Sequence, residues 1–274
     1  MRRLLLSCRR IIALGIGALI LLTACAKQPP VEASPETAKK YLKLRGYEFD
    51  RIGFFSAVNT GDTVLVDAFL RAQIDPNAQD PTTGRTALIS AAAHGDLAVV
   101  KTLVERKADI NIKDNNGYTA LFHAIEARYD EVSSYLAQQP TLDLNARGKN
   151  GVTALNSYVW RGDSTMVSSL LARGADVNLR DLDGDTALHG AAQNGDVDIA
   201  LQLLSKGANV DAKNNVGGTP LMWAAVYGND EVVKTLLEHN AKPALKDNDG
   251  MTALSWAIKN KRTKVVEVLR GNKS

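Results

Sequence analysis

The side chains with the most chemical potential in this sequence are a short run of carboxylates and four scattered histidines. Asp181-Leu182-Asp183-Gly184-Asp185 places carboxylates at alternate positions, an arrangement suited to binding Ca²⁺. An EF-hand calcium loop also needs glycine at its sixth position and glutamate at its twelfth, where this chain has Thr186 and Ala192. The histidines share no spacing, and the sequence has no HExxH motif, nucleophile elbow, phosphate-binding loop or dinucleotide fingerprint. We therefore predict no cofactor, no metal and no enzyme, and keep a divalent-cation site in Asp181–Asp185 and Asp247–Asp249 as the rival hypothesis.

Cys25 is the next candidate functional residue. It could be a structural thiol, a redox group, or the point where the chain is cut and attached to another group. Residues 1–24 contain four arginines, no acidic residue and an apolar stretch from Ile11 to Leu22. That stretch is shorter than the roughly 20 residues that cross a bilayer, and it predicts a secretory signal peptide. Leu22-Thr23-Ala24-Cys25 resembles a bacterial lipobox. The resemblance implies a lipoprotein signal peptide over 1–24 and a lipidated Cys25; an ordinary signal peptide cut beside a cysteine is the alternative.

The composition changes when this leader is removed. Cys8 is the only other cysteine and lies within the leader, so the mature chain has no partner for an intrachain disulfide. Without the four leader arginines, 29 basic residues face 30 acidic ones, a net charge of about −1. A nearly neutral chain has no general attraction to polyanions, which argues against nucleic acid as a partner.

Residues 25–46 are predicted to be a lipidated N-terminus and a proline-containing tether. The segment Ala26–Lys40 has three prolines and no apolar periodicity. Extended at about 3.1 Å per residue, its first dozen residues would hold a folded body roughly 40 Å from a membrane. Ser34-Pro35 then predicts the start of a short helix, with serine as the N-cap and proline in the first helical turn.

The rest of the chain is an internal repeat. Glycine, any residue, threonine and then Ala-Leu or Pro-Leu recur six times, at spacings of 33, 34, 33, 33 and 33 residues. The threonines of this motif are Thr86, Thr119, Thr153, Thr186, Thr219 and Thr252. A period of this length is typical of a stacked repeat architecture.

This motif resembles the ankyrin repeat, and its fullest copy is Asp181–Lys213. The resemblance covers residues 47–274 and implies an all-α solenoid of about seven helix-turn-helix repeats with short hairpin fingers. We place the repeats at about 47–79, 80–113, 114–147, 148–180, 181–213, 214–246 and 247–274. The first lacks the Gly-x-Thr-Ala-Leu finger, and the last carries charge at Lys264, Arg270 and Lys273, as terminal repeats should.

Each repeat has local signals for its turns. The threonine is predicted to cap the first helix, and a glycine in left-handed conformation is predicted to end it, at Gly95, Gly162, Gly195 and Gly228. Repeat 3 has Arg128-Tyr129 in place of that glycine, and repeat 4 has Tyr158-Val159 in place of the usual alanine pair. Bulk at a small position predicts irregular stacking in these two repeats.

The ankyrin resemblance also implies where a partner binds. Partners of such proteins, mostly other proteins, lie in the concave surface made by the finger tips and the exposed face of the first helices. Mapped onto this chain, the candidates are Tyr118, Glu126, Trp160, Arg161, Asp185, Gln193, Asn194, Trp223, Tyr227, Met251 and Trp256.

Aromatic residues and arginine dominate interface hot spots, so Trp160, Arg161, Tyr227 and Tyr118 rank first. Trp223 and Trp256 share one repeat phase, and we interpret them mainly as packing between neighbouring first helices. The resemblance implies a hydrogen-bonded structural role for His189.

Together these features predict a lipid-anchored protein of the bacterial cell envelope, facing the periplasm or the cell surface, that binds a folded protein partner in its groove. Inhibition, immunity or protection, and assembly of a complex are all open outcomes of such binding. Ala26 after the lipidated cysteine weakly favours the outer membrane. A structural spacer in the envelope is a further alternative, and no small-molecule substrate is evident.

Overall fold

The computed structural model describes residues 34–271, so the signal peptide and Cys25 lie outside the described residues. The chain divides into two compact units, residues 1–75 and 76–274. Within the described residues all regular structure is helical, apart from isolated β-bridges such as Gln79 with Thr86 and Arg147 with Thr153. No helix in this part of the chain is both long and apolar enough for a membrane crossing.

The first unit is described as three helices. They are α3 (Pro35–Leu44), α4 (Arg51–Asn59) and α5 (Thr63–Arg71). Ser34 caps α3 by accepting a hydrogen bond from the Thr37 backbone N–H, which confirms the predicted helix start. The α3 helix packs against α5, and its Ala38 and Leu42 are fully buried. Residues within the expected tether segment therefore contribute apolar side chains to a folded core.

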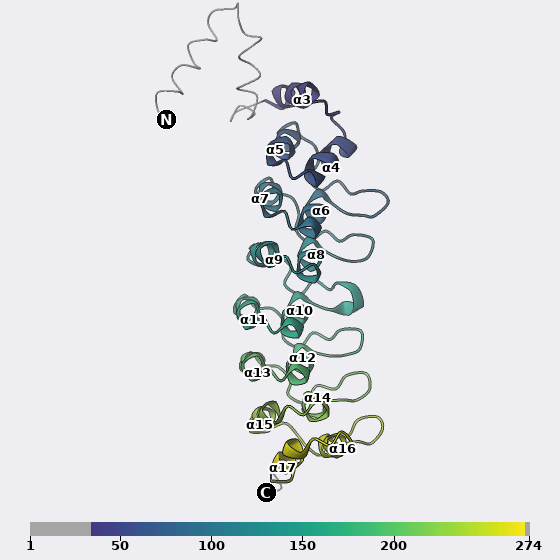
Figure 1. Ribbon diagram of the computed structural model, residues 1–274, viewed down its shortest axis with the longest axis vertical. Helices are drawn as coiled ribbons and strands as arrows, with labels where there is room; N and C mark the ends of the chain where they lie inside the picture. Colours follow the sequence, from purple (N-terminus) through teal and green to yellow (C-terminus); the bar gives the residue numbers. More distant parts are fainter. Residues whose placement is uncertain (1–33, 272–274) are drawn as a thin grey trace, which may run out of the picture. The chain divides into compact units, whose positions relative to one another are not determined.

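The second unit contains six helix pairs in its described part, each preceded by a finger (Figure 1). The first, inner helix of each pair is α6 (Ala87–His94), α8 (Ala120–Glu126), α10 (Ala154–Arg161), α12 (Ala187–Asn194), α14 (Pro220–Tyr227) or α16 (Ala253–Lys259). The second, outer helix is α7 (Leu97–Glu105), α9 (Asp130–Ala137), α11 (Ser164–Ala172), α13 (Val197–Ser205), α15 (Asp230–Glu238) or α17 (Thr263–Gly271). A 3₁₀ turn, η1 (Lys149–Gly151), lies in one finger.

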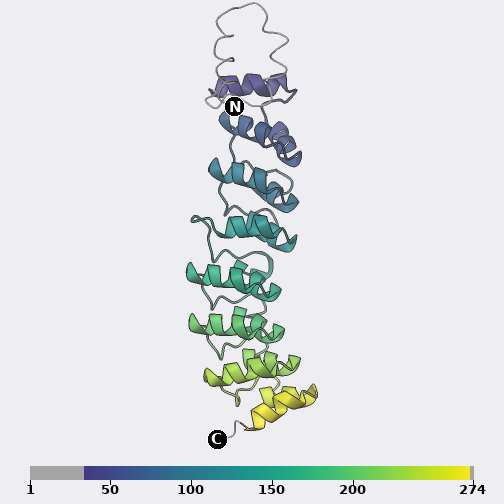
Figure 2. The ribbon, with the colours of Figure 1, turned by 60° about the vertical axis from the view of Figure 1, so that its left-hand side comes forward.

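The helix pairs of this unit lie one above another in layers (Figure 2). Leu254 in the last repeat is half-buried, but in the five preceding repeats the leucine two residues after the capping threonine is buried. These leucines are at most 2% exposed and are Leu88, Leu121, Leu155, Leu188 and Leu221. Burying such a side chain stabilises the fold by about 1.5–3 kcal/mol, so neighbouring repeats supply the core that a single helix pair lacks.

The caps follow the sequence prediction. All six motif threonines are N-caps of inner helices, and Gly95, Gly162, Gly195 and Gly228 end their helices with φ between +70° and +87°. Arg128 adopts the same left-handed region, with φ of 60°, where repeat 3 lacks glycine. Left-handed backbone costs a residue with a Cβ about 1–2 kcal/mol, so tertiary packing must hold Arg128 there.

The predicted irregular stacking occurs between repeats 3 and 4. The contact of α8 with α10 is less extensive than that of the other neighbouring inner helices. Tyr158, on α10, is 1% exposed. Its hydroxyl lies near Ser133 without a hydrogen bond of ordinary geometry, and burial raises its pKa to about 12.

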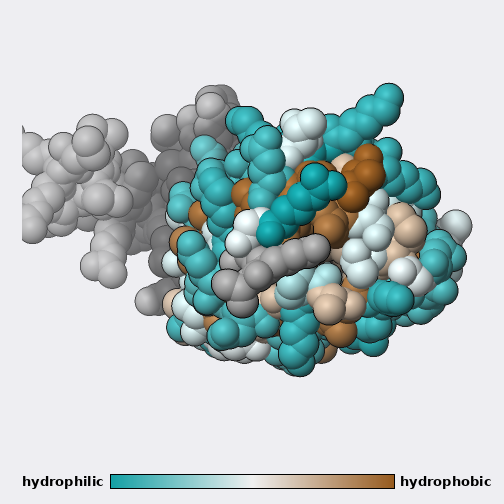
Figure 3. Space-filling view, turned by 90° about the horizontal axis from the view of Figure 1, so that it is seen from below, coloured by the Kyte–Doolittle hydropathy of each residue, from teal (hydrophilic) through white to brown (hydrophobic). Residues whose placement is uncertain are grey.

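The C-terminal end of the solenoid combines hydrophilic and hydrophobic surface (Figure 3). Lys264 and Arg270 are exposed, as predicted for a terminal repeat, while Lys273 lies outside the described residues. Ile258 is also 52% exposed, so the end of the described solenoid is not purely polar.

Candidate protein-binding groove

One repeat phase on the inner helices faces the fingers. Its members, spaced by 33 or 34 residues, are Ser90, His123, Ser157, Gly190, Trp223 and Trp256. Hydrogen bonds show the direction of this face: His123 Nε2 lies 2.8 Å from the finger carboxylate of Asp114, and Trp256 Nε1 donates to Asp247 Oδ2 at 2.7 Å. The face between inner helices and fingers is the candidate groove.

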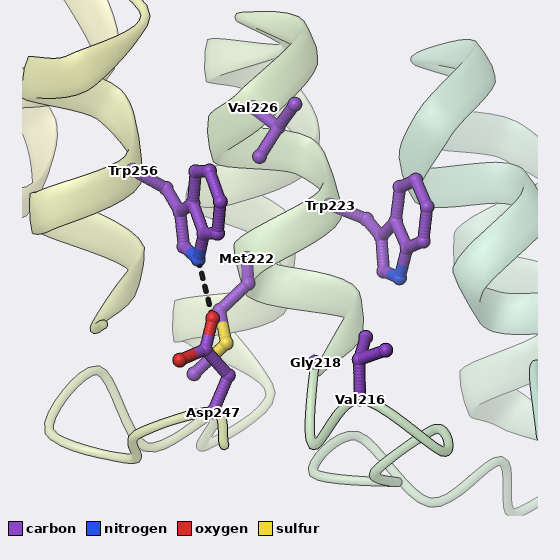
Figure 4. Close-up of a pocket in the computed structure, with 7 residues that line it drawn as sticks. All are labelled: Val216, Gly218, Met222, Trp223, Val226, Asp247 and Trp256. Carbon is purple, nitrogen blue, oxygen red and sulfur yellow. Dashed lines mark hydrogen bonds between the residues drawn. The ribbon is translucent and has the colours of Figure 1, made fainter. Parts of the chain in front are cut away.

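The two tryptophans of this phase line an apolar recess, here named the aromatic slot, of about 230 Å³ (Figure 4). Its walls are Val216, Gly218, Met222, Trp223, Val226, Asp247 and Trp256. The sequence favoured a packing role for both tryptophans, but each is only half-buried. They therefore combine packing with an accessible indole surface.

Side chains from the same helices hold the two indoles in place. Tyr227 stacks on Trp223 with ring centroids 5.9 Å apart and planes at 15°, and the Lys259 ammonium lies 4.5 Å from the centroid of Trp256. These rings have few rotatable bonds, and the hydrogen bond from Trp256 Nε1 to Asp247 fixes one of them, so the slot is largely preformed. Preformed apolar recesses with few polar groups are typical of binding sites.

Toward the N-terminal end of the groove, the face is polar. Tyr118 donates from its hydroxyl to Glu126 Oε1 at 2.9 Å, and its ring lies 5.4 Å from that of His123. Burial alone would raise the pKa of Asp114, but hydrogen bonds from His123 and from two backbone N–H groups outweigh it and lower that pKa. Asp114 thus stays ionised and anchors the finger to α8.

Trp160 and Arg161, ranked first from the sequence, differ in what the fold leaves accessible. Trp160 is 37% exposed and its indole lies over Gly190 of the next inner helix. Arg161 is 17% exposed at its side chain, donates to the Ile125 carbonyl at 3.2 Å and pairs with Asp130. The guanidinium of Arg161 therefore uses these hydrogen bonds to join repeats 3 and 4.

The remaining candidates lie at different depths. Asp185 is 9% exposed and accepts a hydrogen bond from Asn214 Nδ2 at 2.8 Å, so we leave this expected groove residue out of the partner surface. Asn194 is exposed, but its amide donates to the Val159 and Trp160 carbonyls. Gln193 and Met251 are half-buried.

His189 has the structural role that the sequence implied. Its Nδ1 accepts from the Thr186 backbone N–H at 3.1 Å, so the ring proton lies on Nε2, which donates to the Gly218 carbonyl of the next repeat at 3.2 Å. Burial lowers the pKa of His189 to about 4. The neutral ring fastens two consecutive repeats together.

In the acidic segments Asp181–Asp185 and Asp247–Asp249, the first carboxylate accepts hydrogen bonds from the backbone of its own finger. Asp181 Oδ1 accepts from the backbone N–H groups of Asp183 and Asp185, and Asp247 Oδ1 accepts from those of Asp249 and Met251. Between residues 34 and 271, no three His, Cys, Asp or Glu side chains are grouped as metal ligands. In these two fingers the carboxylates stabilise tight turns.

Sequence reasoning missed part of the surface around the slot. Val216 and Met222 contribute walls, and Lys261 and Arg262 lie on the turn after α16 beside Tyr227. The repeat period identifies equivalent positions, but it does not say which side chains from two different repeats meet.

Comparison with known proteins agrees with this architecture. Residues 54–148, 140–214 and 212–274 match the family described as ankyrin repeats (3 copies). The ankyrin repeat domain of Bcl-3, in its crystal structure, superposes with a TM-score of 0.66 at 30% identity, covering 80% of this chain and 97% of that one.

Two sequence relatives match over shorter segments. The ankyrin repeat and SAM domain-containing protein 6 of Rattus norvegicus is 41% identical over 64 residues, 23% of this chain and 7% of that protein. The protein phosphatase 1 regulatory subunit 27 of Homo sapiens is 34% identical over 83 residues, 30% of this chain and 54% of that protein. The matches span less than two thirds of either relative. The repeat motif, the capped helix pairs and the family match over residues 54–274 together show that this chain belongs to the ankyrin-repeat family.

Proposed function

We propose that this chain is a lipid-anchored interaction module of the bacterial cell envelope, whose groove binds a folded protein partner. The observation that carries the binding proposal is the row of accessible aromatic side chains on the finger-facing side of the inner helices. Trp160 and Tyr227 are 37% and 42% exposed, and the aromatic slot lies between α14 and α16.

General properties of the family support this reading. Ankyrin repeats are protein–protein interaction modules, and the human relative is by its name a regulatory subunit of a phosphatase. Large aromatic side chains bury much area at low rotamer cost, which makes them frequent hot spots. The polar groups described in this groove form hydrogen bonds within the fold. A partner that simply binds in the groove and blocks it, without any reaction, fits this arrangement. Inhibition, protection and assembly of a complex remain the outcomes that such binding serves.

The groove is tested by affinity capture with the full-length chain, solubilised from the membranes of its producing cells. A Trp160→Ala, Tyr227→Ala variant is expected to recover its specific partner at least ten-fold less well, because each truncated hot spot costs about 2 kcal/mol. The matched control is Leu201→Ala, which removes a 41% exposed side chain from the outer helix α13. Equal recovery by the double variant and the wild type, or no specific protein at all, would refute groove binding.

The envelope location rests on the leader and the Leu22–Cys25 motif. Expressed in a bacterium fed an alkyne analogue of palmitate, the wild-type chain is expected to carry the label. Cys25→Ser should lose it and keep the uncleaved leader. Cys8→Ser is the control and should be labelled normally, since that cysteine is removed with the leader. A wild-type chain that carries no label and stays in the cytosol would contradict the anchor.

A further inference from the structure

The aromatic slot has the dimensions and lining for one large apolar side chain. Its volume is about 230 Å³, and its walls are apolar except for Asp247. The Asp247 carboxylate already accepts from Trp256 Nε1 and from two backbone N–H groups. An entering group therefore meets indole, thioether and aliphatic surface rather than an available charge.

A group of four cations, here named the basic cluster, lies beside this slot. Its members are Lys259, Lys261, Arg262 and Lys264, all exposed. No acidic residue occurs from Met251 to Val266. Among the described residues none of the four forms an ion pair with a carboxylate, whereas Asp230 and Glu231 on the neighbouring turn are paired with Lys234 at 3.7 and 2.6 Å. In the described part of the chain, Glu267 lines a neighbouring depression with Lys261, Arg262 and Arg270 without forming an ion pair with the cluster, so the cluster keeps a net positive charge.

Two contacts join the basic cluster to the slot. Arg262 Nε donates to the carbonyl of Val226, a wall of the slot, at 2.9 Å. Tyr227 stacks on Trp223 with one side and lines a depression of about 250 Å³ with Lys261, Arg262 and Lys264 on the other. Slot and cluster are therefore one continuous surface at the C-terminal end of the groove.

We propose that this surface binds an acidic segment of the protein partner, which inserts one large apolar side chain between Trp223 and Trp256 and places its carboxylates on the basic cluster. The proposal rests on the proposed function and adds the chemistry of the partner to it. Charge complementarity sets the orientation of the segment, because exposed Asp249 belongs to the finger before α16 and the cations lie at and after the end of that helix. The apolar anchor supplies affinity, and the charges supply encounter rate and selectivity.

The test uses a displayed library of random 12-residue peptides selected on the purified full-length chain. Enriched peptides are expected to carry net negative charge and one or two large apolar residues. Their affinity should fall at least ten-fold in Trp223→Ala, Trp256→Ala and, separately, in Lys261→Glu, Lys264→Glu. Arg262 is left intact because it also supports α14. The charge control is Lys101→Glu, Lys206→Glu, which reverses an exposed lysine on α7 and an exposed lysine directly after α13 and should bind normally.

Salt gives a second readout, since rim charges are screened while apolar contacts are not. Raising ionic strength from about 50 to 500 mM should weaken the selected acidic peptides several-fold in the wild type and much less in Lys261→Glu, Lys264→Glu. Enrichment of basic or neutral peptides, or equal binding by the charge-reversed variant, would overturn the proposal. So would vesicles of anionic phospholipid that bind this surface while no peptide is enriched.

The two proposals fail in different ways. Some selected peptides could bind elsewhere in the groove and lose affinity only in Trp160→Ala. That result would contradict the acidic-segment proposal but would still support groove binding. A partner captured independently of Trp160 and Tyr227 would contradict groove binding of that partner, while acidic peptides selected on the slot would still show which segment chemistry the slot binds.

Discussion

Between pH 7.5 and pH 4, the free energy of unfolding of the wild-type chain is expected to fall by about 3 kcal/mol more than that of a His189→Asn variant. The folded pKa of His189 is lowered by burial from 6.5 to about 4, and one pKa unit corresponds to about 1.4 kcal/mol. Above pH 6.5 the ring is neutral in the folded and the unfolded chain, so its ionisation does not change the free energy of unfolding. As pH falls from 6.5 to about 4, the unfolded chain takes up a proton that the folded chain does not, so stability is lost across that window.

Asparagine is the suitable replacement because repeat 4 already has Asn156 at this position, where it completes a capping box with Thr153. His189→Asn therefore keeps the cap, removes the titrating ring and loses the bond to Gly218. At pH 7.5 that loss should cost about 1 kcal/mol. The variant is then less stable than the wild type at pH 7.5 and more stable at pH 4.

Chemical denaturation followed by circular dichroism at both pH values measures the two differences. Asp185, whose pKa is raised by burial, is present in both proteins, so only its coupling to His189 Nε2, 3.9 Å from its carboxylate, enters the comparison. A stability difference of the same sign and size at pH 7.5 and pH 4 would show that His189 is not the group responsible.

Gly217→Ala is expected to cost about 3 kcal/mol of unfolding free energy, whereas Gly250→Ala costs about 1 kcal/mol. Both glycines occupy the same finger position and have nearly equal φ, 78° and 77°. A Cβ at Gly217 would lie 2.6 Å from Asn248 Oδ1 and 2.9 Å from the Asn248 backbone N, while a Cβ at Gly250 would have nothing within 4 Å. The left-handed conformation is common to both, so the difference isolates the contact between consecutive fingers.

The Asn248 N–H donates to the Val216 carbonyl at 3.1 Å, and its side-chain amide donates to the Asn215 carbonyl at 3.1 Å. A methyl group at residue 217 must displace Asn248 and so disturb these two hydrogen bonds between consecutive fingers. Denaturant midpoints of the two variants give the comparison. If both lose the same stability, the close approach of the fingers contributes nothing beyond backbone strain.

Much of the fold was predictable because its signals are local. A threonine hydroxyl caps the helix that begins at the next residue, and a glycine in left-handed conformation nine residues after that threonine ends the helix, as at Thr153 and Gly162. Such features involve neighbours within one or two turns, so the residue types and their period were sufficient. The helix at Ser34 followed from the same reasoning.

The sequence alone could not place side chains whose neighbours lie one repeat away along the chain. The sequence ranked Arg161 as an accessible anchor and Trp223 and Trp256 as packing residues. In the fold, Arg161 is largely buried against Ile125, and the two tryptophans line a recess. The left-handed conformation of Arg128 was likewise not indicated by its residue type.

The sequence by itself determined the repeat, its phase, the caps of its helices and the set of positions that face the fingers. Only the tertiary structure decided which of those side chains remain accessible and that Lys261, Arg262 and Tyr227 join one surface with the aromatic slot. The physical reason is distance along the chain: the contacts that bury or expose these groups connect residues about 33 positions apart, and the spacing and rotation between stacked helix pairs set those contacts.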